Sequence, residues 1–149
     1  MDEKLERDLA REDLSLAPMH KRIKAFVVDE LLISVLIFIA FWDRINSAST
    51  VTESLESLNE VVMWVVFLKI AYHTVFVALY GATLGKLWQK IYVITIDDLG
   101  KPSFMAALSR GSMRAISEWL FYLGFIWAWI NPNRQTWQDK IGRTIVVQP

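Results

Sequence analysis

Two long apolar segments constrain the fold of this chain more than any other feature of its sequence. They cover Ile23–Trp42 and Val61–Tyr80, twenty residues each. An α-helix of about 20 residues is about 30 Å long, which matches the thickness of the hydrocarbon core of a bilayer. Both segments are apolar around most of a helix circumference, as lipid-facing helices are. We therefore predict an all-α integral membrane protein of one domain, with transmembrane helices at 22–42 and 61–80 in contact with the lipid bilayer.

A third apolar segment is too short to reveal its own topology. Only Trp119–Ile130 is free of polar residues, and Gly124 lies near its middle. A helix over 115–130 could cross the membrane at a tilt, or it could enter and return on the same side. The sequence leaves both alternatives open.

The distribution of lysine and arginine predicts the side that each loop faces. Residues 1–24 contain six of them and 81–114 contain five, whereas 43–60 contain only Arg44. Basic loops remain in the cytoplasm. We therefore expect a charged cytoplasmic arm at 1–21, which is either a solvated helix or a partner-binding one, a cytoplasmic loop at 81–114 and an external acidic loop at 43–60. The protein would then be a multi-pass protein of the cytoplasmic (inner) membrane with its N-terminus inside.

Two short segments are typical of β-strands. Residues 91–96 and 144–147 are rich in β-branched side chains, and a turn-like run follows the first of them. An isolated strand needs a partner, so we expect these two to pair in a small cytoplasmic β element. Pairing would hold the tail at 131–149, which contains Asp139, on the cytoplasmic side. Three full spans with an external tail are the alternative.

Ionisable residues within the apolar segments need an explanation, because charge at membrane depth is unfavourable. Asp29 and Glu30 lie in the first segment. His73 lies at a similar depth in the second, with Lys69 one turn deeper, and Glu118 lies near the start of the third. They fit a set of static ion pairs that joins the helices, a proton or cation path, or one acid exposed to water or a partner. Two helices cannot enclose a pore, so a path would require an oligomer.

Catalytic, metal and nucleotide motifs are missing from the sequence. The run from Gly81 to Lys86 is not a phosphate-binding loop, since only three residues separate its glycines and a leucine follows the lysine. Gly81 and Gly85 instead suit close helix packing or a helix end. Sixteen basic residues balance sixteen acidic ones, which disfavours nucleic-acid binding, and the lack of cysteine excludes thiol chemistry. We expect no enzyme activity, no cofactor, no metal and no nucleotide.

The motifs, taken in order, resemble the RDD family. Arg22, Asp29 and Asp139 resemble the Arg-Asp-Asp set that gives the family its name. The Gly81–Lys86 run resembles its linker, and 135–147 resembles its C-terminal signature. The resemblance implies a small bacterial or archaeal membrane protein, here of the bacterial cytoplasmic membrane. The general role of the family is not established, and some members are linked to sodium(potassium)/proton exchange.

The same residues suggest how the tail is attached to the helices. We expect Arg22 to pair with Asp29 or with Asp139, so that Asp139 joins the tail to the helices by reaching Arg22 or Lys86. This arrangement is an ion-pair hypothesis about structure, and it implies no catalysis.

Two functions remain in view. The leading prediction is a structural, assembly or accessory membrane subunit, in a homo-oligomer or a larger complex. The alternative is a subunit of a homo-oligomeric monovalent cation/proton exchanger that uses Asp29, Glu30 and His73. Lys69 and Glu30 are not part of the namesake set of the family, so its hint of exchange does not transfer directly.

Overall fold

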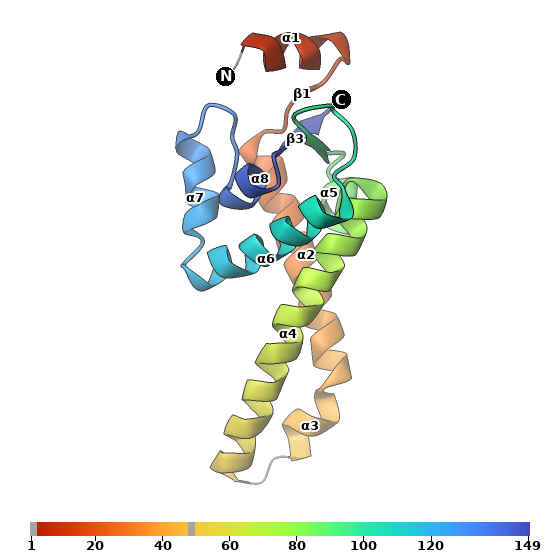
Figure 1. Ribbon diagram of the computed structural model, residues 1–149. Helices are drawn as coiled ribbons and strands as arrows, with labels where there is room; N and C mark the ends of the chain where they lie inside the picture. The colour runs from red at the N-terminus through yellow and green to blue at the C-terminus, as the bar shows by residue number, and fades with distance from the viewer. Residues whose placement is uncertain (1–2, 48–49) are drawn as a thin grey trace.

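Two long antiparallel helices form the body of the molecule. The computed structural model describes residues 3–47 and 50–149. Residues 1–2 of the predicted arm and 48–49 of the predicted external loop therefore lie outside the described residues. Helix α2 (Met19–Ala40) and helix α4 (Val51–Tyr80) lie side by side in Figure 1 and are joined at their far end by α3 (Trp42–Ser47).

Helix α4 is longer than the sequence suggested, and the expected loop at 43–60 is mostly helical. Thr50 begins α4 ten residues early, because its Oγ1 accepts a hydrogen bond from the Glu53 backbone at 3.2 Å and the Glu53 carboxylate accepts one from the Thr50 backbone in return. This capping box satisfies the first unpaired amides of the helix. The other end of α4 is Gly81, whose φ of 68° is the left-handed conformation that favours glycine.

Among the helices of the described residues, only α4 has both the length and the apolar composition of a membrane-spanning helix. Helix α2 differs because every stretch of spanning length within it contains Lys24, Asp29 and Glu30. The number of membrane-spanning helices therefore depends on how these charges are compensated.

A small antiparallel sheet lies at the opposite end from α3. Its strand order is β1–β3–β2, with β1 at Ser15–Leu16, β2 at Tyr92–Thr95 and β3 at Thr144–Gln148. The predicted pairing of 91–96 with 144–147 is confirmed, with Val93 opposite Val146. Strand β1 was not foreseen, because two residues carry no detectable alternation.

The N-terminal arm is packed on this sheet and is not a freely solvated helix. Helix α1 (Glu3–Arg11) buries Leu5 and Leu9 in a cluster with Ile145 and Val147. The spacing of four residues puts both leucines on one face, and the charged residues take the other face.

The third apolar segment is two helices with a sharp turn between them. Helix α6 (Phe104–Trp119) packs along α4, and α7 (Leu123–Ile130) returns from it. Phe121 and Tyr122 have φ values of 53° and 61°, which an α-helix cannot contain. The Ser117 hydroxyl accepts a hydrogen bond from the Gly124 backbone at 3.1 Å and holds the turn closed.

The C-terminal part of the chain returns to the end of the molecule at which the N-terminal arm lies (Figure 1). Helix α8 (Trp137–Ile141) follows α7 and leads into β3, and both termini lie at the same end of the molecule in Figure 1. The short helix α5 (Leu84–Trp88) links α4 to the sheet at that end. This position of the tail, on the same side as the arm, agrees with the alternative in which 115–130 enters the membrane and returns on the same side.

Candidate functional site

The ionisable residues near the apolar helices gather in one cluster, where α2 and α4 meet α5, α6 and α8. We call it the polar cluster. Its members come from five helices, and the sequence had already indicated all of them except two arginines of α6. The members are Arg22, Asp29, Glu30, Lys69, His73, Lys86, Arg110, Arg114, Glu118 and Asp139.

A closed ring of ion pairs forms the part of the cluster nearest the middle of α4. The Lys69 ammonium lies 2.6 Å from a Glu30 oxygen and 2.7 Å from a Glu118 oxygen. The Arg114 guanidinium completes the ring, with nitrogens 2.8 Å from Glu30 and 3.1 Å from Glu118. Two cations and two carboxylates thus alternate and neutralise each other across α2, α4 and α6. Arg114 also lies over the Phe26 ring, 4.8 Å from its centroid.

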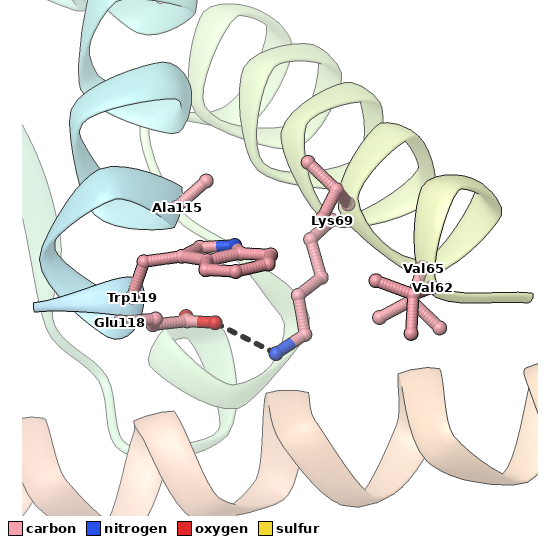
Figure 2. A pocket seen from close by; sticks show the side chains of 7 residues that line it. Val62, Val65, Lys69, Ala115, Glu118 and Trp119 are labelled. Atoms are coloured by element: carbon pink, nitrogen blue, oxygen red, sulfur yellow. Dashed lines mark hydrogen bonds and ion pairs between the residues drawn. The ribbon is translucent and has the colours of Figure 1, made fainter. Parts of the chain in front are cut away.

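The ring borders a pocket between α4 and α6. Figure 2 shows Lys69 reaching across from α4 to Glu118, with the Trp119 ring above them. The pocket has a volume of about 250 Å³, and its other walls are the apolar side chains of Val62, Val65, Val66 and Ala115. The only charged groups that it offers are therefore already paired with each other.

Asp29 is fully buried and serves as an acceptor for α4 and α5. It accepts hydrogen bonds from the Tyr72 hydroxyl at 2.7 Å, from Thr83 Oγ1 at 2.6 Å and from the Gly85 backbone at 2.8 Å. The expected partners Arg22 and His73 do not bind it. The structure differs because α5 presents its unpaired first amides directly to α2, where a buried carboxylate satisfies them.

Gly85 makes this contact possible. A Cβ at this position would lie 2.1 Å from the Ala25 carbonyl oxygen, so only glycine lets α5 approach α2 this closely. Gly81 is the end of α4. Both glycines therefore occupy the positions that the sequence suggested, one in close packing and one at a helix end.

Asp139 is the second fully buried carboxylate, and it binds two arginines. Its Oδ2 lies 2.5 Å from Arg22 and its Oδ1 lies 2.6 Å from Arg110. Its carboxylate also accepts a hydrogen bond from the Thr136 backbone at 2.9 Å, which begins α8. Burial alone would raise the pKa of Asp139, but Arg22 and Arg110 outweigh it and hold the pKa well below its usual range. Of the two partners expected for Arg22, the structure selects Asp139.

His73 is buried without an acidic partner. Its Nδ1 lies 3.5 Å from an Arg114 nitrogen, and within the described residues its Nε2 has no hydrogen bond. The expected meeting of His73 with Asp29 or Glu30 does not occur. Arg114 lies against His73 and binds Glu30, and the Asp29 oxygens are bound by other groups of α4 and α5.

Arg110 and Arg114 are the residues that sequence reasoning missed as cluster members. They had been counted only as loop charges of 81–114. A signal was present, since Arg110, Arg114 and Glu118 are spaced four apart and so share one face of a helix. That spacing could have identified a charged face of α6.

Metal-binding groups are absent from the part of the chain that the structure describes. No three histidine, aspartate or glutamate side chains gather there closely enough to hold an ion. The cluster instead pairs carboxylates with basic side chains.

The comparisons with known proteins identify the family. The model of the RDD family matches residues 16–143, a range that contains every member of the polar cluster. No curated protein and no solved structure matches the chain significantly. The resemblance carried by Arg22, Asp29 and Asp139 is thereby confirmed. The chain belongs to the RDD family, whose members are generally associated with membranes.

Proposed function

We propose that this protein is a non-catalytic membrane protein that acts as an accessory or assembly subunit. Helices α2 and α4 cross the cytoplasmic membrane, and the α6–α7 turn enters it from the side that holds the sheet. The arm and the tail then lie in the cytoplasm, as the lysine and arginine distribution favours. Leu31, Ile39 and Phe67 are each more than 60% exposed on α2 and α4, which suits a surface in contact with lipid or with a partner helix.

The observation that carries this proposal is that the chain itself already occupies the carboxylates of the polar cluster. Each carboxylate at membrane depth is occupied by donors of the chain itself: Asp29 by three, and Glu30 and Glu118 by two cations each. A cation path needs carboxylate oxygens that an incoming ion can reach. Interlocked ion pairs instead favour a fixed helix arrangement, which leaves the outer surface to carry the function.

A second candidate is cation/proton exchange in a homo-oligomer. Its support is that Glu30 is 23% exposed and that Lys69 and Glu118 border the pocket of Figure 2. In this candidate a monovalent cation would take the place of the Lys69 ammonium between Glu30 and Glu118, and that ammonium would release its proton to water.

Transport in vesicles separates the two candidates. The purified protein is reconstituted with a pH-sensitive dye inside, its orientation is verified, and gradients of sodium, potassium or lithium are imposed. We expect no cation-dependent proton flux. Flux that disappears in Asp29→Asn or Glu30→Gln, but persists in the exposed control Asp43→Asn, would overturn the accessory role in favour of exchange.

A photo-crosslinking amino acid tests the accessory role directly. Placed at the exposed Phe67 in living cells, it is expected to give a discrete protein adduct of this chain or of another membrane protein. The same probe at the half-buried Phe76 is the control and should give no such adduct. Lipid adducts alone at Phe67 and at the equally exposed Leu31 would contradict the proposal.

A further inference from the structure

A small cavity within the polar cluster is lined mainly by positive charge. Its volume is about 20 Å³, which is room for about one water molecule or one monatomic ion. Four cationic side chains line it: Arg22 from α2, Lys86 from α5, and Arg110 and Arg114 from α6. Phe26, Phe125 and Gln138 close the remaining walls.

The cations around this cavity are not fully compensated. Arg22 and Arg110 share Asp139, and Arg114 is paired within the ring. Lys86 has no ion pair or hydrogen bond to a described residue. Asp29 attracts it electrostatically, but the Asp29 oxygens are already bound by other groups. Across the whole cluster one cationic group is therefore left without a carboxylate of its own.

Two buried polar atoms in the wall also lack partners. Arg110 is 1% exposed, and its Nε–H makes no hydrogen bond to the described residues. Gln138 is 4% exposed, and its Oε1 is likewise without a partner. A rotated glutamine amide offers an NH₂ donor in place of the oxygen. The unsatisfied Arg110 Nε–H lies beside a void of one-ion size, and the rotated amide would add a second donor, so the cavity has room for an acceptor that the chain does not supply.

We propose that this cavity binds one small monovalent anion of the halide class, and that the anion binds together with a proton on Lys86. The site is distinct from the proposed cation path and from the accessory role, since neither uses an anion. Oxyanions such as sulfate are too large for a cavity of about 20 Å³.

The surroundings of Lys86 explain the linked proton. Lys86 is half-buried, and the loss of water around it together with the charges of Arg114, Arg110 and Arg22 lowers the pKa of Lys86 to about 7 against the opposing effect of Asp29. His73 of α4 is the other titratable group that faces Lys86. A bound anion favours the charged ammonium, and by reciprocity the ammonium favours the anion.

Thermal melting of the full-length protein in detergent tests the site, with chloride compared with gluconate and sulfate at equal ionic strength. At pH 6.5 we expect chloride to raise Tm in a saturable way and the two larger anions to have no such effect. Above pH about 7, the apparent Kd for chloride should rise by up to about tenfold per pH unit, because Lys86 loses its proton. Equal stabilisation by all three anions would show charge screening only and would overturn the proposal.

Variants of Lys86 make the test specific. Lys86→Gln should lose the chloride effect, whereas Lys86→Arg should keep it but lose its dependence on pH between 7 and 9, because the guanidinium stays charged. Lys24→Gln, on the exposed side of α2, is the matched control and should behave as the wild type. If Lys86→Gln does not fold, the Lys86→Arg profile decides alone: unchanged pH dependence in that variant would overturn the role of Lys86.

Discussion

Asp139 is the residue through which the C-terminal tail is attached to the long helices. It is buried completely and binds Arg22 of α2 and Arg110 of α6. Its carboxylate also caps the N-terminus of α8 by accepting a hydrogen bond from the Thr136 backbone. One carboxylate thereby joins three helices that are far apart in the sequence. Removing one partner of a buried ion pair costs about 3–5 kcal/mol, since the remaining charge is left uncompensated.

We predict that Asp139→Asn lowers the free energy of unfolding by about 3–5 kcal/mol at pH 7. The pKa of Asp139 is depressed in the folded state, so its stabilising effect is complete above the unfolded pKa of about 4 and is lost as the pH falls below it. The wild type should therefore lose stability below pH 4 more steeply than the variant does. Melting in detergent from pH 7 to pH 3 measures both. Equal acid sensitivity of the two proteins would argue against the ion pairs.

Gly85 is a second single residue on which the packing depends, because its lack of a side chain lets α5 approach the backbone of α2. Gly85→Ala should destabilise the protein by about 1–3 kcal/mol or more, because the added Cβ meets the backbone of α2. Gly100→Ala is the control, since there the nearest atoms belong to the flexible Asp98 side chain. Thermal melting checks the pair, and equal losses for both variants would contradict the close contact of α5 with α2.

At the scale of the elements, α2, α4 and α6 are joined by the ring of Glu30, Lys69, Glu118 and Arg114. Each helix supplies at least one charge, and no carboxylate depends on a single cation. Removal of one member therefore unbalances the ring, whereas removal of the neighbouring pair Lys69 and Glu118 leaves Glu30 paired with Arg114.

A double-mutant cycle tests this arrangement. Lys69→Met and Glu118→Gln should each destabilise the protein, and the double variant should be more stable than the sum of the single losses implies, by about 1–3 kcal/mol. Chemical or thermal unfolding of the four proteins gives the coupling energy. Additive losses would show that Lys69 and Glu118 do not interact. A matched cycle on the exposed pair Asp97 and Arg143 should give a coupling near zero.

At the scale of the whole molecule, both termini and the sheet lie at one end and α3 lies at the other. Strand β3 is the physical cause, because it pairs with β1 from the arm and with β2 from the segment after α4. If α2 and α4 cross a membrane as we propose, a tail held in that sheet lies on the same side as the arm.

Single-cysteine labelling tests this topology, since the chain contains no cysteine of its own. With a membrane-impermeant maleimide, Asn46→Cys in α3 should react in intact cells. Lys90→Cys and Pro149→Cys should react only after the membrane is opened. Reaction of Pro149→Cys from outside would favour three full spans, and reaction of none of the positions after opening would indicate a buried label site.

The sequence alone was enough to predict the two long helices, the pairing of 91–96 with 144–147 and the RDD family. These features depend on local patterns: a run of apolar residues, β-branched strands and motifs in a fixed order. The Arg22–Asp139 pair was one of two alternatives, because spacing along a helix favoured Asp29 equally.

Only the tertiary structure decided which charges meet. Asp29 binds α5 instead of Arg22. Arg110 and Arg114 are members of the polar cluster, and Lys86 lines a cavity. These contacts join residues from 29 positions apart (Arg110 and Asp139) to 84 positions apart (Arg114 and Glu30), and they depend on how closely α5 and α6 approach the long helices. Local periodicity contains no information on that distance, because it is set by small residues such as Gly85 and by the turn at Phe121 and Tyr122.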